Sequence, residues 1–319
     1  RLRALFPSVP LAVGGVYATL CPDHARRVLA PDYLVAGEGE NDLLALAAAI
    51  APGRFDATPL DPARLDDLPA PAWDLSAMRS WPAVAASRGC PMRCAYCASG
   101  RLYRAYRRRD PGRVAEEILR LARDQGATDV AFYDDALIDG PAGSFARLLD
   151  HLIEAGAPVR LHTPNGVAFA HIDEPMAQRM RAAGVQTVRI SLESADPGRL
   201  AGLNRPADIG PFDRAMQALR RAGYSSGQIG VYLLAALPGQ SEDEVRRSID
   251  RVLDAGGTPL VGEYSPIPGT PEFDHARADS GLPLDDEPLL HNNSVFHRLA
   301  PWSRDGLIDR LRRYSKRQA

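Results

Sequence analysis

The feature that most restricts the fold is a regular alternation of short apolar strands with amphipathic helices through the middle of the chain. Such alternation predicts an α/β protein in which a parallel sheet is joined by right-handed crossovers. Six repeats predict a sheet that curls into an open, partial (β/α)6 barrel, with binding groups at the carboxyl ends of the strands. The six predicted strands lie at 83–87, 129–133, 159–162, 187–192, 229–235 and 260–264.

Local capping signals mark where the helices of this barrel begin and end. Asp110 followed by Pro111 starts one helix, and Gly126 stops it. Ser241 and Glu244 have the spacing of a capping box at the start of another helix. Further helices are predicted at 145–153 before Gly156, between Asp173 and Gly184, and at 212–219 before Gly223.

The segments on either side of the barrel have a different character. Residues 1–55 contain two strand and glycine-turn units, which predict part of a Rossmann-like, doubly wound domain whose opening residues 1–7 are the end of an amphipathic helix. Residues 56–80 are rich in Pro, Asp and Ala and indicate a linker. The barrel occupies 81–270, and in the C-terminal extension, 271–319, periodicity fades into loops before a basic helix at 303–317.

The charge of the chain is nearly balanced. Lysine and arginine total 38 against 40 acidic residues, a net charge of −2, which implies no overall attraction to nucleic acid or lipid. No apolar run has the roughly 18 to 20 residues of a membrane helix and no signal segment opens the chain, so we expect a cytoplasmic protein. The exception is 104–109, with four arginines; we interpret it as a solvated approach to a helix that neutralises nearby acids, with RNA binding as the alternative.

Three cysteines follow the first barrel strand within eight residues of one another. Cys90, Cys94 and Cys97 can surround one 4Fe–4S cubane in a single loop and leave its fourth iron without a protein thiolate, so that iron needs an outside ligand. A zinc loop is the alternative, although zinc usually takes four protein ligands and no second pair or suitably spaced histidine follows. Cys21 stands apart and is expected to be a buried thiol.

The Cys-x3-Cys-x2-Cys loop, with aromatic Tyr96 before its last cysteine and a βα barrel after it, resembles the radical S-adenosylmethionine (radical SAM) superfamily over residues 81–270. The resemblance implies that S-adenosylmethionine binds the open iron through its amino and carboxylate groups. One electron then splits S-adenosylmethionine into methionine and a 5′-deoxyadenosyl radical, and this radical abstracts hydrogen from a substrate. It also implies a small-molecule or peptide substrate and an external electron donor of the flavodoxin or ferredoxin type, and it places Tyr96 against the adenine.

The same resemblance suggests further cofactor-binding residues. Asp134 and Asp135, where the family more commonly has Gly-Gly-Glu, would receive the methionine amino group, because carboxylates suit an ammonium. Ser191 and Glu193 would bind the ribose hydroxyls or the methionine end. Each pair has a plainer interpretation, as solvated turn acids or as charge at a helix start. Arg205 is a weaker candidate partner for the cofactor carboxylate and is equally expected as a surface arginine.

Several other polar or turn segments are compatible with more than one role. The 237–240 turn resembles a family turn and supports the fold only, and Ile267, in the 265–270 turn, would line the adenine pocket. The polar cluster 162–166 lies at the end of the third predicted strand, where we expect it to face the barrel mouth. Either this cluster holds substrate, or its Asn-Gly pair is an ordinary turn. The loop 291–294 is assigned either a substrate role or none. No residue is assigned as catalytic.

Residues 13–22 and 33–40 resemble the final strands of the cobalamin-binding domain that precedes the barrel in one large subfamily. We therefore expect the chain to retain only the last part of such a domain, and the full-length protein to bind cobalamin and to carry out methyl transfer or rearrangement. Two alternatives stand beside this one. The first is a non-catalytic iron–sulfur or zinc protein, and the second an RNA-modifying radical enzyme, for which no nucleic-acid module is visible in the sequence.

Overall fold

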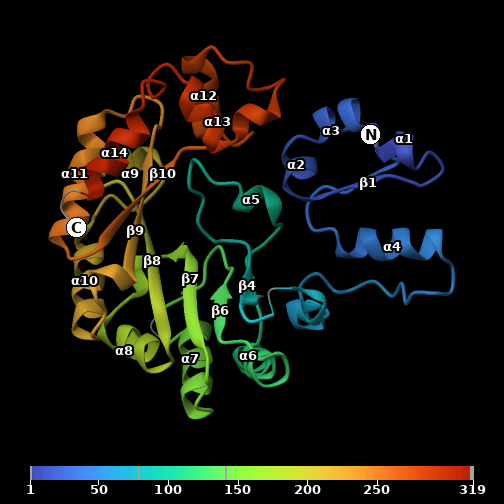
Figure 1. Ribbon diagram of the computed structural model, residues 1–319, viewed down its shortest axis with the longest axis horizontal. Helices are drawn as coiled ribbons and strands as arrows, with labels where there is room; N and C mark the ends of the chain where they lie inside the picture. The colour runs from blue at the N-terminus through green and yellow to red at the C-terminus, as the bar shows by residue number, and fades with distance from the viewer. Residues whose placement is uncertain (1, 78, 141, 317–319) are drawn as a thin grey trace.

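The computed structural model describes residues 2–77, 79–140 and 142–316, and its centre is a six-stranded parallel sheet. The strands stand in the order β10-β9-β8-β7-β6-β3, so that neighbours in sequence are neighbours in space (Figure 1). The sheet has two free edges and curves without closing, which confirms the predicted partial barrel. Its strands are β3 Ala83–Val84, β6 Asp129–Phe132, β7 Arg160–Val167, β8 Val185–Glu193, β9 Ile229–Ala235 and β10 Thr258–Glu263.

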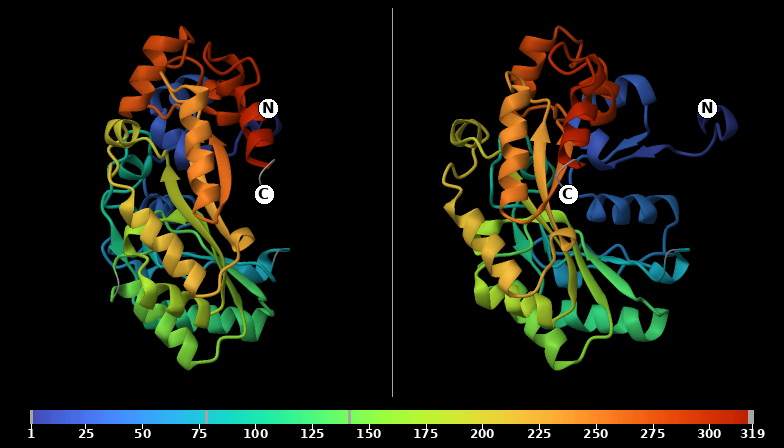
Figure 2. Two further views of the ribbon diagram at one scale, coloured as in Figure 1. Left: turned by 90° about the vertical axis from the view of Figure 1, so that its left-hand side faces the viewer. Right: turned by 60° about the vertical axis from the view of Figure 1, so that its left-hand side comes forward.

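Helices between the strands cover the outer face of the sheet (Figure 2). The predicted caps form, because Asp110 accepts a hydrogen bond from the Arg113 amide and Asp173 accepts one from the Met176 amide. The core lies between sheet and helices, where the rings of Phe132 and Phe145 pack edge to face. These helices are α6 Pro111–Gln125, α7 Ser144–Glu154, α8 Glu174–Ala182, α9 Pro197–Gly202, α10 Gly210–Arg221 and α11 Glu242–Asp254.

The third barrel strand is longer than the sequence predicts. β7 continues to Val167, through the Asn165-Gly166 pair, so the interpretation of that pair as an ordinary turn was wrong. Pro164 cannot donate to a neighbouring strand, and the register between β7 and β8 shifts between Thr163 and Val167. The Tyr232 hydroxyl donates to the Pro164 carbonyl at 2.7 Å and holds this irregular stretch in the sheet.

The first predicted strand, 83–87, is divided in two. After β3 the chain leaves the sheet, and β4 (Ser87–Arg88) pairs antiparallel with β5 (Arg107–Arg108). The intervening residues, 89–106, contain the three cysteines and the short helix α5 (Ser99–Leu102). This two-stranded ribbon is the neck of the cysteine loop, and it fixes where the loop leaves the barrel.

The N-terminal residues form a small unit beside the barrel (Figure 1). Its two short strands are parallel, as a Rossmann-like unit requires. The residues that follow it, 56–80, include 3₁₀ turns at Leu65–Asp67 and Trp73–Leu75, and Leu65 is buried. Arg1, in the predicted opening helix, lies outside the described residues. The unit's elements are α1 Leu2–Leu5, β1 Ala12–Val13, α2 Gly15–Leu20, α3 Pro22–Leu29, β2 Tyr33–Leu34 and α4 Glu40–Ile50.

The C-terminal residues are more ordered than predicted. The expectation of loops after residue 271 was wrong, because helices α12 and α13 form there around a second apolar cluster that contains Tyr264, Phe273 and Phe296. The predicted basic helix starts later than expected, and α14 packs on α11, where Arg310 pairs with Glu242. Arg317 lies outside the described residues. The elements are α12 Pro271–Ser280, a 3₁₀ turn Pro288–His291, α13 Asn293–Leu299 and α14 Leu307–Lys316.

No helix within 2–77, 79–140 or 142–316 combines the length and the apolar character that crossing a membrane requires.

Candidate active site

The cysteine loop starts at a glycine that no other residue can replace without strain. Gly89 has φ of +81°, and a Cβ at this position would lie 2.7 Å from the Ala105 carbonyl oxygen on the other side of the neck. Beyond it, Cys90 and Cys94 are half-buried and Cys97 is exposed. Burial raises the pKa of the Cys90 thiol, although a hydrogen bond from the Met92 backbone N–H opposes the shift.

Backbone and side-chain hydrogen bonds fasten this loop to the carboxyl end of the barrel. The Ala95 amide donates to the Leu203 carbonyl at 3.0 Å, and the Ala95 carbonyl accepts from the Glu272 amide at 3.1 Å. The Asn204 side-chain amide donates to the Arg93 carbonyl at 2.6 Å. The loop is therefore held by segments that follow β8 and β10, at the end of the sheet where α/β folds bind ligands.

Arg205 lies against the cysteines. Its Nη1 is 3.8 Å from the Cys94 sulfur and 3.6 Å from the Met92 sulfur, and its Nη2 donates to the Ser191 carbonyl. Its Nε is buried without a hydrogen-bond partner, which is costly for a charged donor unless a ligand supplies an acceptor. The guanidinium is thus in the site and has one donor free for an anionic group.

Glu193 and Tyr96 are hydrogen-bonded to each other beside Arg205. Burial raises the pKa of the Glu193 carboxyl, and the positive charge of Arg205 and the hydrogen bond from Tyr96 oppose that rise. Burial, reinforced by the charge of Glu193, also raises the pKa of the Tyr96 hydroxyl, which stays protonated and able to donate. Glu193 has φ of +71°, at the point where the register between β8 and β9 shifts.

Ser191 faces the neighbouring strand closely. A Cβ on Gly166, which has φ of +81°, would lie 2.2 Å from the Ser191 hydroxyl oxygen, so glycine is required at that position. The shape of β7 at its carboxyl end therefore makes room for Ser191. The sequence indicated that Gly166 is a turn residue, because the residues of β7 alone do not reveal that β8 packs closely against it.

The two neighbouring aspartates point to different places. Asp134 is buried, and its carboxylate accepts from the Ser87 hydroxyl at 2.5 Å and from the Ala86 amide at 3.1 Å, which fixes the neck of the cysteine loop. Burial raises the pKa of Asp134 to about 6, against those hydrogen bonds. Asp135 accepts from the Ser99 hydroxyl at 2.6 Å, next to the cysteines. Only Asp135 has its side chain on the cysteine side.

Ile267 lies in the turn that supports the cysteine loop from the other side. Its carbonyl accepts from the Thr270 hydroxyl at 2.8 Å, and Thr270 in turn caps α12. The next residues of the turn reach the loop, because Arg101 donates to the Gly269 carbonyl. Ile267 is half-buried at this position.

His162 does not face the barrel mouth, and that prediction was wrong. Its two ring nitrogens are each 2.9 Å from a partner, Thr187 Oγ1 and Asp129 Oδ1, toward the amino-terminal ends of the strands. Asn165, on the same strand, does approach the site and donates to the Asp134 carbonyl at 3.5 Å. Because β7 continues past His162, the polar cluster is divided between the two ends of the barrel.

The loop at 291–294 is held in place by contacts with other described residues. His291 is 2.7 Å from the Leu284 carbonyl through Nε2 and 3.8 Å from the half-buried Cys21 sulfur through Nδ1. Burial lowers the pKa of its imidazole. Asn292 is the N-cap of α13 and accepts from the Ser294 amide at 2.8 Å.

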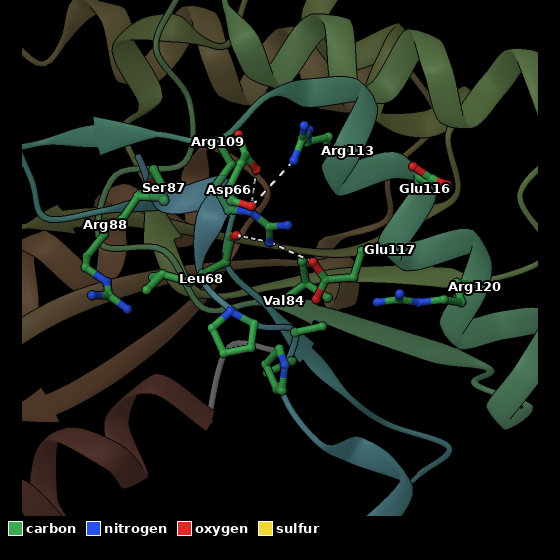
Figure 3. Close-up of a pocket in the computed structure, with 16 residues that line it drawn as sticks. Asp66, Leu68, Val84, Ser87, Arg88, Arg109, Arg113, Glu116, Glu117 and Arg120 are labelled. Carbon is green, nitrogen blue, oxygen red and sulfur yellow. Dashed lines mark hydrogen bonds and ion pairs between the residues drawn. The ribbon is translucent and has the colours of Figure 1, made fainter. Parts of the chain in front are cut away.

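The arginine run leads into α6, and the prediction that it neutralises nearby acids is confirmed; it is not simply solvated, because Arg107 and Arg108 form β5. Three of its four arginines are ion-paired with acids from other segments. Figure 3 shows Arg109 between Asp66 and Glu117, at 3.1 and 2.7 Å, in a cavity of about 490 Å³ beside β3. Arg108 pairs with Asp139, and Arg107 with Glu38. These partners leave Arg107, Arg108 and Arg109 engaged within the protein.

The donor set fits an iron–sulfur cluster better than a single metal ion. Within the described part of the chain, no three His, Cys, Asp or Glu side chains converge closely enough to bind one ion. A structural zinc site normally takes four protein ligands, whereas a cubane offers a separate iron atom to each of three thiolates and keeps one iron open. Three thiolates on one loop, with an arginine donor left free beside them, therefore match a cluster that takes an additional ligand.

The chain has a partial α/β barrel with three cysteines in a loop at the carboxyl ends of its strands. These features define a class of iron–sulfur enzymes, and comparison with known proteins identifies that class. The family model described as the Radical SAM superfamily matches residues 84–252, which is more than half of the chain. The chain belongs to the radical SAM superfamily. It is accordingly an enzyme, and its fold implies a 4Fe–4S cluster and S-adenosylmethionine.

Two curated proteins of similar sequence are named as enzymes. The anaerobic magnesium-protoporphyrin IX monomethyl ester cyclase of Rubrivivax gelatinosus is 26% identical over 68% of this chain and 44% of its own length. An uncharacterized methyltransferase of Pyrococcus horikoshii is 26% identical over 86% of this chain and 64% of its own length. The chain thus spans about half to two thirds of the length of these curated relatives.

A solved structure shows the same fold over most of the chain. The radical S-adenosylmethionine methyltransferase TsrM from Kitasatospora setae, with tryptophan substrate and a SAM analogue bound, superposes with a TM-score of 0.69 at 20% identity. The match covers 86% of this chain and 59% of TsrM. A second structure of that protein holds cobalamin and a 4Fe–4S cluster.

Proposed function

We propose that Cys90, Cys94 and Cys97 hold a 4Fe–4S cluster and that the site binds S-adenosylmethionine on its open iron. When bound, cluster and cofactor supply reductive cleavage to a 5′-deoxyadenosyl radical, which abstracts hydrogen from the substrate. The observation that carries the proposal is the buried, unpartnered Nε of Arg205 next to the Cys94 sulfur. It supports an anionic group, such as the cofactor's carboxylate, at that position.

The remaining side chains would bind and orient the cofactor. Glu193, held by Tyr96, offers carboxylate oxygens to hydroxyl groups, and Tyr96 offers a ring face to adenine. Asp135 lies beside the cysteines, where its charge suits an ammonium group. Asp134 acts differently in this account, because its carboxylate is engaged at the neck of the cysteine loop.

We further propose a cobalamin-dependent methyl transfer or rearrangement for the whole protein. Support comes from the relative named as a methyltransferase and from the cobalamin bound in TsrM. Within the chain, Gly15 and Gly37 both have positive φ, at +83° and +85°, in the turns that follow β1 and β2, where a backbone can approach a ligand closely. Full-length protein purified with a cobalt source should show corrin absorbance, and its absence counts against cobalamin.

The partners and location follow as proposals from the same chemistry. The substrate is a small molecule or a peptide. The electron comes from an external flavodoxin or ferredoxin, and the exposed Cys97 supports a cluster edge within reach of such a donor. A cytoplasmic location suits thiolate ligands that oxygen-rich, oxidising compartments would convert to disulfides.

Release of 5′-deoxyadenosine tests the proposed cleavage. Protein reconstituted with iron and sulfide under anaerobic conditions, then given dithionite and S-adenosylmethionine, should release it. A Cys94→Ala variant should not, and a Cys21→Ala variant, which keeps all three loop cysteines, should release it at the wild-type rate. If Cys94→Ala still releases 5′-deoxyadenosine, Cys94 is not an essential cluster ligand and the three-cysteine assignment fails. If the protein contains one zinc and no iron, the non-catalytic alternative replaces this proposal.

A further inference from the structure

The neck of the cysteine loop receives a contact from the N-terminal unit that the proposed chemistry does not use. Glu38 accepts from Arg88 Nη1 at 3.1 Å on β4 and also from Arg107 on β5. A single carboxylate thus bridges the two strands whose pairing closes the loop. Its side chain is only 11% exposed, and that of Arg107 is 13% exposed, so these ion pairs are largely shielded from water.

The turn that carries Glu38 is built to present it. Gly37 has φ of +85°, and its amide donates to the Thr19 hydroxyl at 2.8 Å, which ties the turn to α2. A Cβ on Gly39 would lie 2.8 Å from a methyl carbon of Val35. The positive φ favours glycine at position 37, and a side chain at position 39 would require Val35 to move; the glutamate between them points to the barrel.

Each strand residue at the neck is held by an acid from a different part of the chain. Ser87 donates to Asp134, and Arg108 pairs with Asp139. The N-terminal unit contributes Glu40, which accepts from Arg88 Nη1 at 2.5 Å, and Glu38, which reaches both strands. Burial alone would raise the pKa of Glu38, but hydrogen bonds from Arg107 and Arg88 lower it, so the carboxylate is charged at neutral pH. When Glu38 is removed, Arg88 keeps its ion pair with Glu40, whereas Arg107 loses its ion pair and its largely shielded charge is left uncompensated.

We propose that Glu38 is a positioning residue for the iron–sulfur cluster, acting through Arg88 and Arg107 to hold the cysteine loop closed from the N-terminal unit. The inference rests on the proposed function, since it requires a cluster in that loop. It also makes the N-terminal unit part of the cluster-binding structure, because displacement of the Gly37-to-Gly39 turn would open the neck.

Two variants with the same change of charge test the proposal. Glu38→Gln removes the bridging charge and keeps the size of the side chain. Asp42→Asn removes a charge from the exposed first turn of α4 and serves as the matched control. Both are reconstituted anaerobically, and the rate of iron loss to an excess of chelator is measured together with the unfolding temperature.

We expect Glu38→Gln to lose iron roughly fivefold to tenfold faster than wild type and Asp42→Asn to match wild type. In the cluster-free proteins, hydrogen exchange of peptides covering 87–108 should rise in Glu38→Gln alone, while peptides of α7 and α8 stay unchanged. Glu38→Asp, which keeps the charge, should restore part of the protection. Equal iron loss in wild type and Glu38→Gln, or equal exchange at 87–108, overturns the proposal. If wild-type protein binds no cluster at all, the proposed function fails first, and the exchange comparison still decides the role of Glu38.

Discussion

Nη1 of Arg205 lies 3.8 Å from the sulfur of Cys94, and the same guanidinium has a buried Nε without a partner. The arginine comes from the segment after β8, and the cysteine from the loop after β3, so the sheet topology brings them together. The guanidinium at this position has a donor left for a ligand, directly beside a cysteine of the loop. The arrangement links cluster binding to recognition of the cofactor.

Arg205→Lys should weaken binding of S-adenosylmethionine by about tenfold without lowering the iron content. Lysine keeps the charge but loses the planar fork, so the donors to Ser191 and to the cofactor cannot both be supplied. Titration calorimetry on the reconstituted protein measures this. Arg298→Lys, on an exposed part of α13, is the control and should bind as wild type does. An unchanged dissociation constant in Arg205→Lys would remove Arg205 from the cofactor site.

The elements that the sequence predicted well depend on local information. β9 was predicted at its observed bounds, because its sequence is a continuous apolar run between turns. The cap of α6 at Asp110 and its stop at Gly126, with φ of +69°, are set by residues within the helix ends themselves. The cysteine loop was found in the same way, since its ligands are close in sequence.

The features that sequence reasoning missed depend on partners far along the chain. The ion-pair partners of the arginine run come from four other segments, among them the turn that carries Glu38. Likewise, Glu244 was predicted to complete a capping box with Ser241, but its side chain bonds Arg199, Gln240 and Ser194 instead. The ion pair with Arg199 is favoured over the capping hydrogen bond from the Glu244 side chain, and no pattern in the helix itself predicts this.

Glu244→Ala should lower the free energy of unfolding by about 3 kcal/mol, because it leaves the largely buried Arg199 without its carboxylate. Asp243→Ala, at the next position in the exposed first turn of α11, should cost less than about 1 kcal/mol, the scale of a helix-dipole contact. Chemical denaturation of both variants measures the difference. Equal losses in the two variants would show that the Arg199–Glu244 pair adds little.

Asp134 should make the folded protein less stable as the pH rises. The folded state raises the pKa of its carboxyl from 3.8 to about 6, so the unfolded chain releases its proton first. Stability attributable to this group is full below about pH 4, falls through the window up to about pH 6 and is then constant, by about 3 kcal/mol in total. Unfolding of wild type and Asp134→Asn across this range measures the effect.

In that comparison the stability of wild type relative to Asp134→Asn should decline between about pH 4 and pH 6. Asparagine can still accept from the Ala86 amide and donate to the Ser87 hydroxyl, so the neck keeps its contacts. Asp243→Asn, which changes an exposed carboxylate, should track wild type throughout. Parallel curves for wild type and Asp134→Asn would mean that folding does not raise the pKa of Asp134.

The central claim is that three thiolates hold a cluster whose remaining iron is open to S-adenosylmethionine. Electron paramagnetic resonance of the anaerobically reconstituted, dithionite-reduced protein tests it most directly, with spectra recorded before and after the cofactor is added. The account predicts a 4Fe–4S signal whose g-values shift when the cofactor binds, and loss of that signal when Cys90, Cys94 and Cys97 are all replaced by alanine. A signal that ignores the cofactor, or that survives the triple replacement, would contradict it.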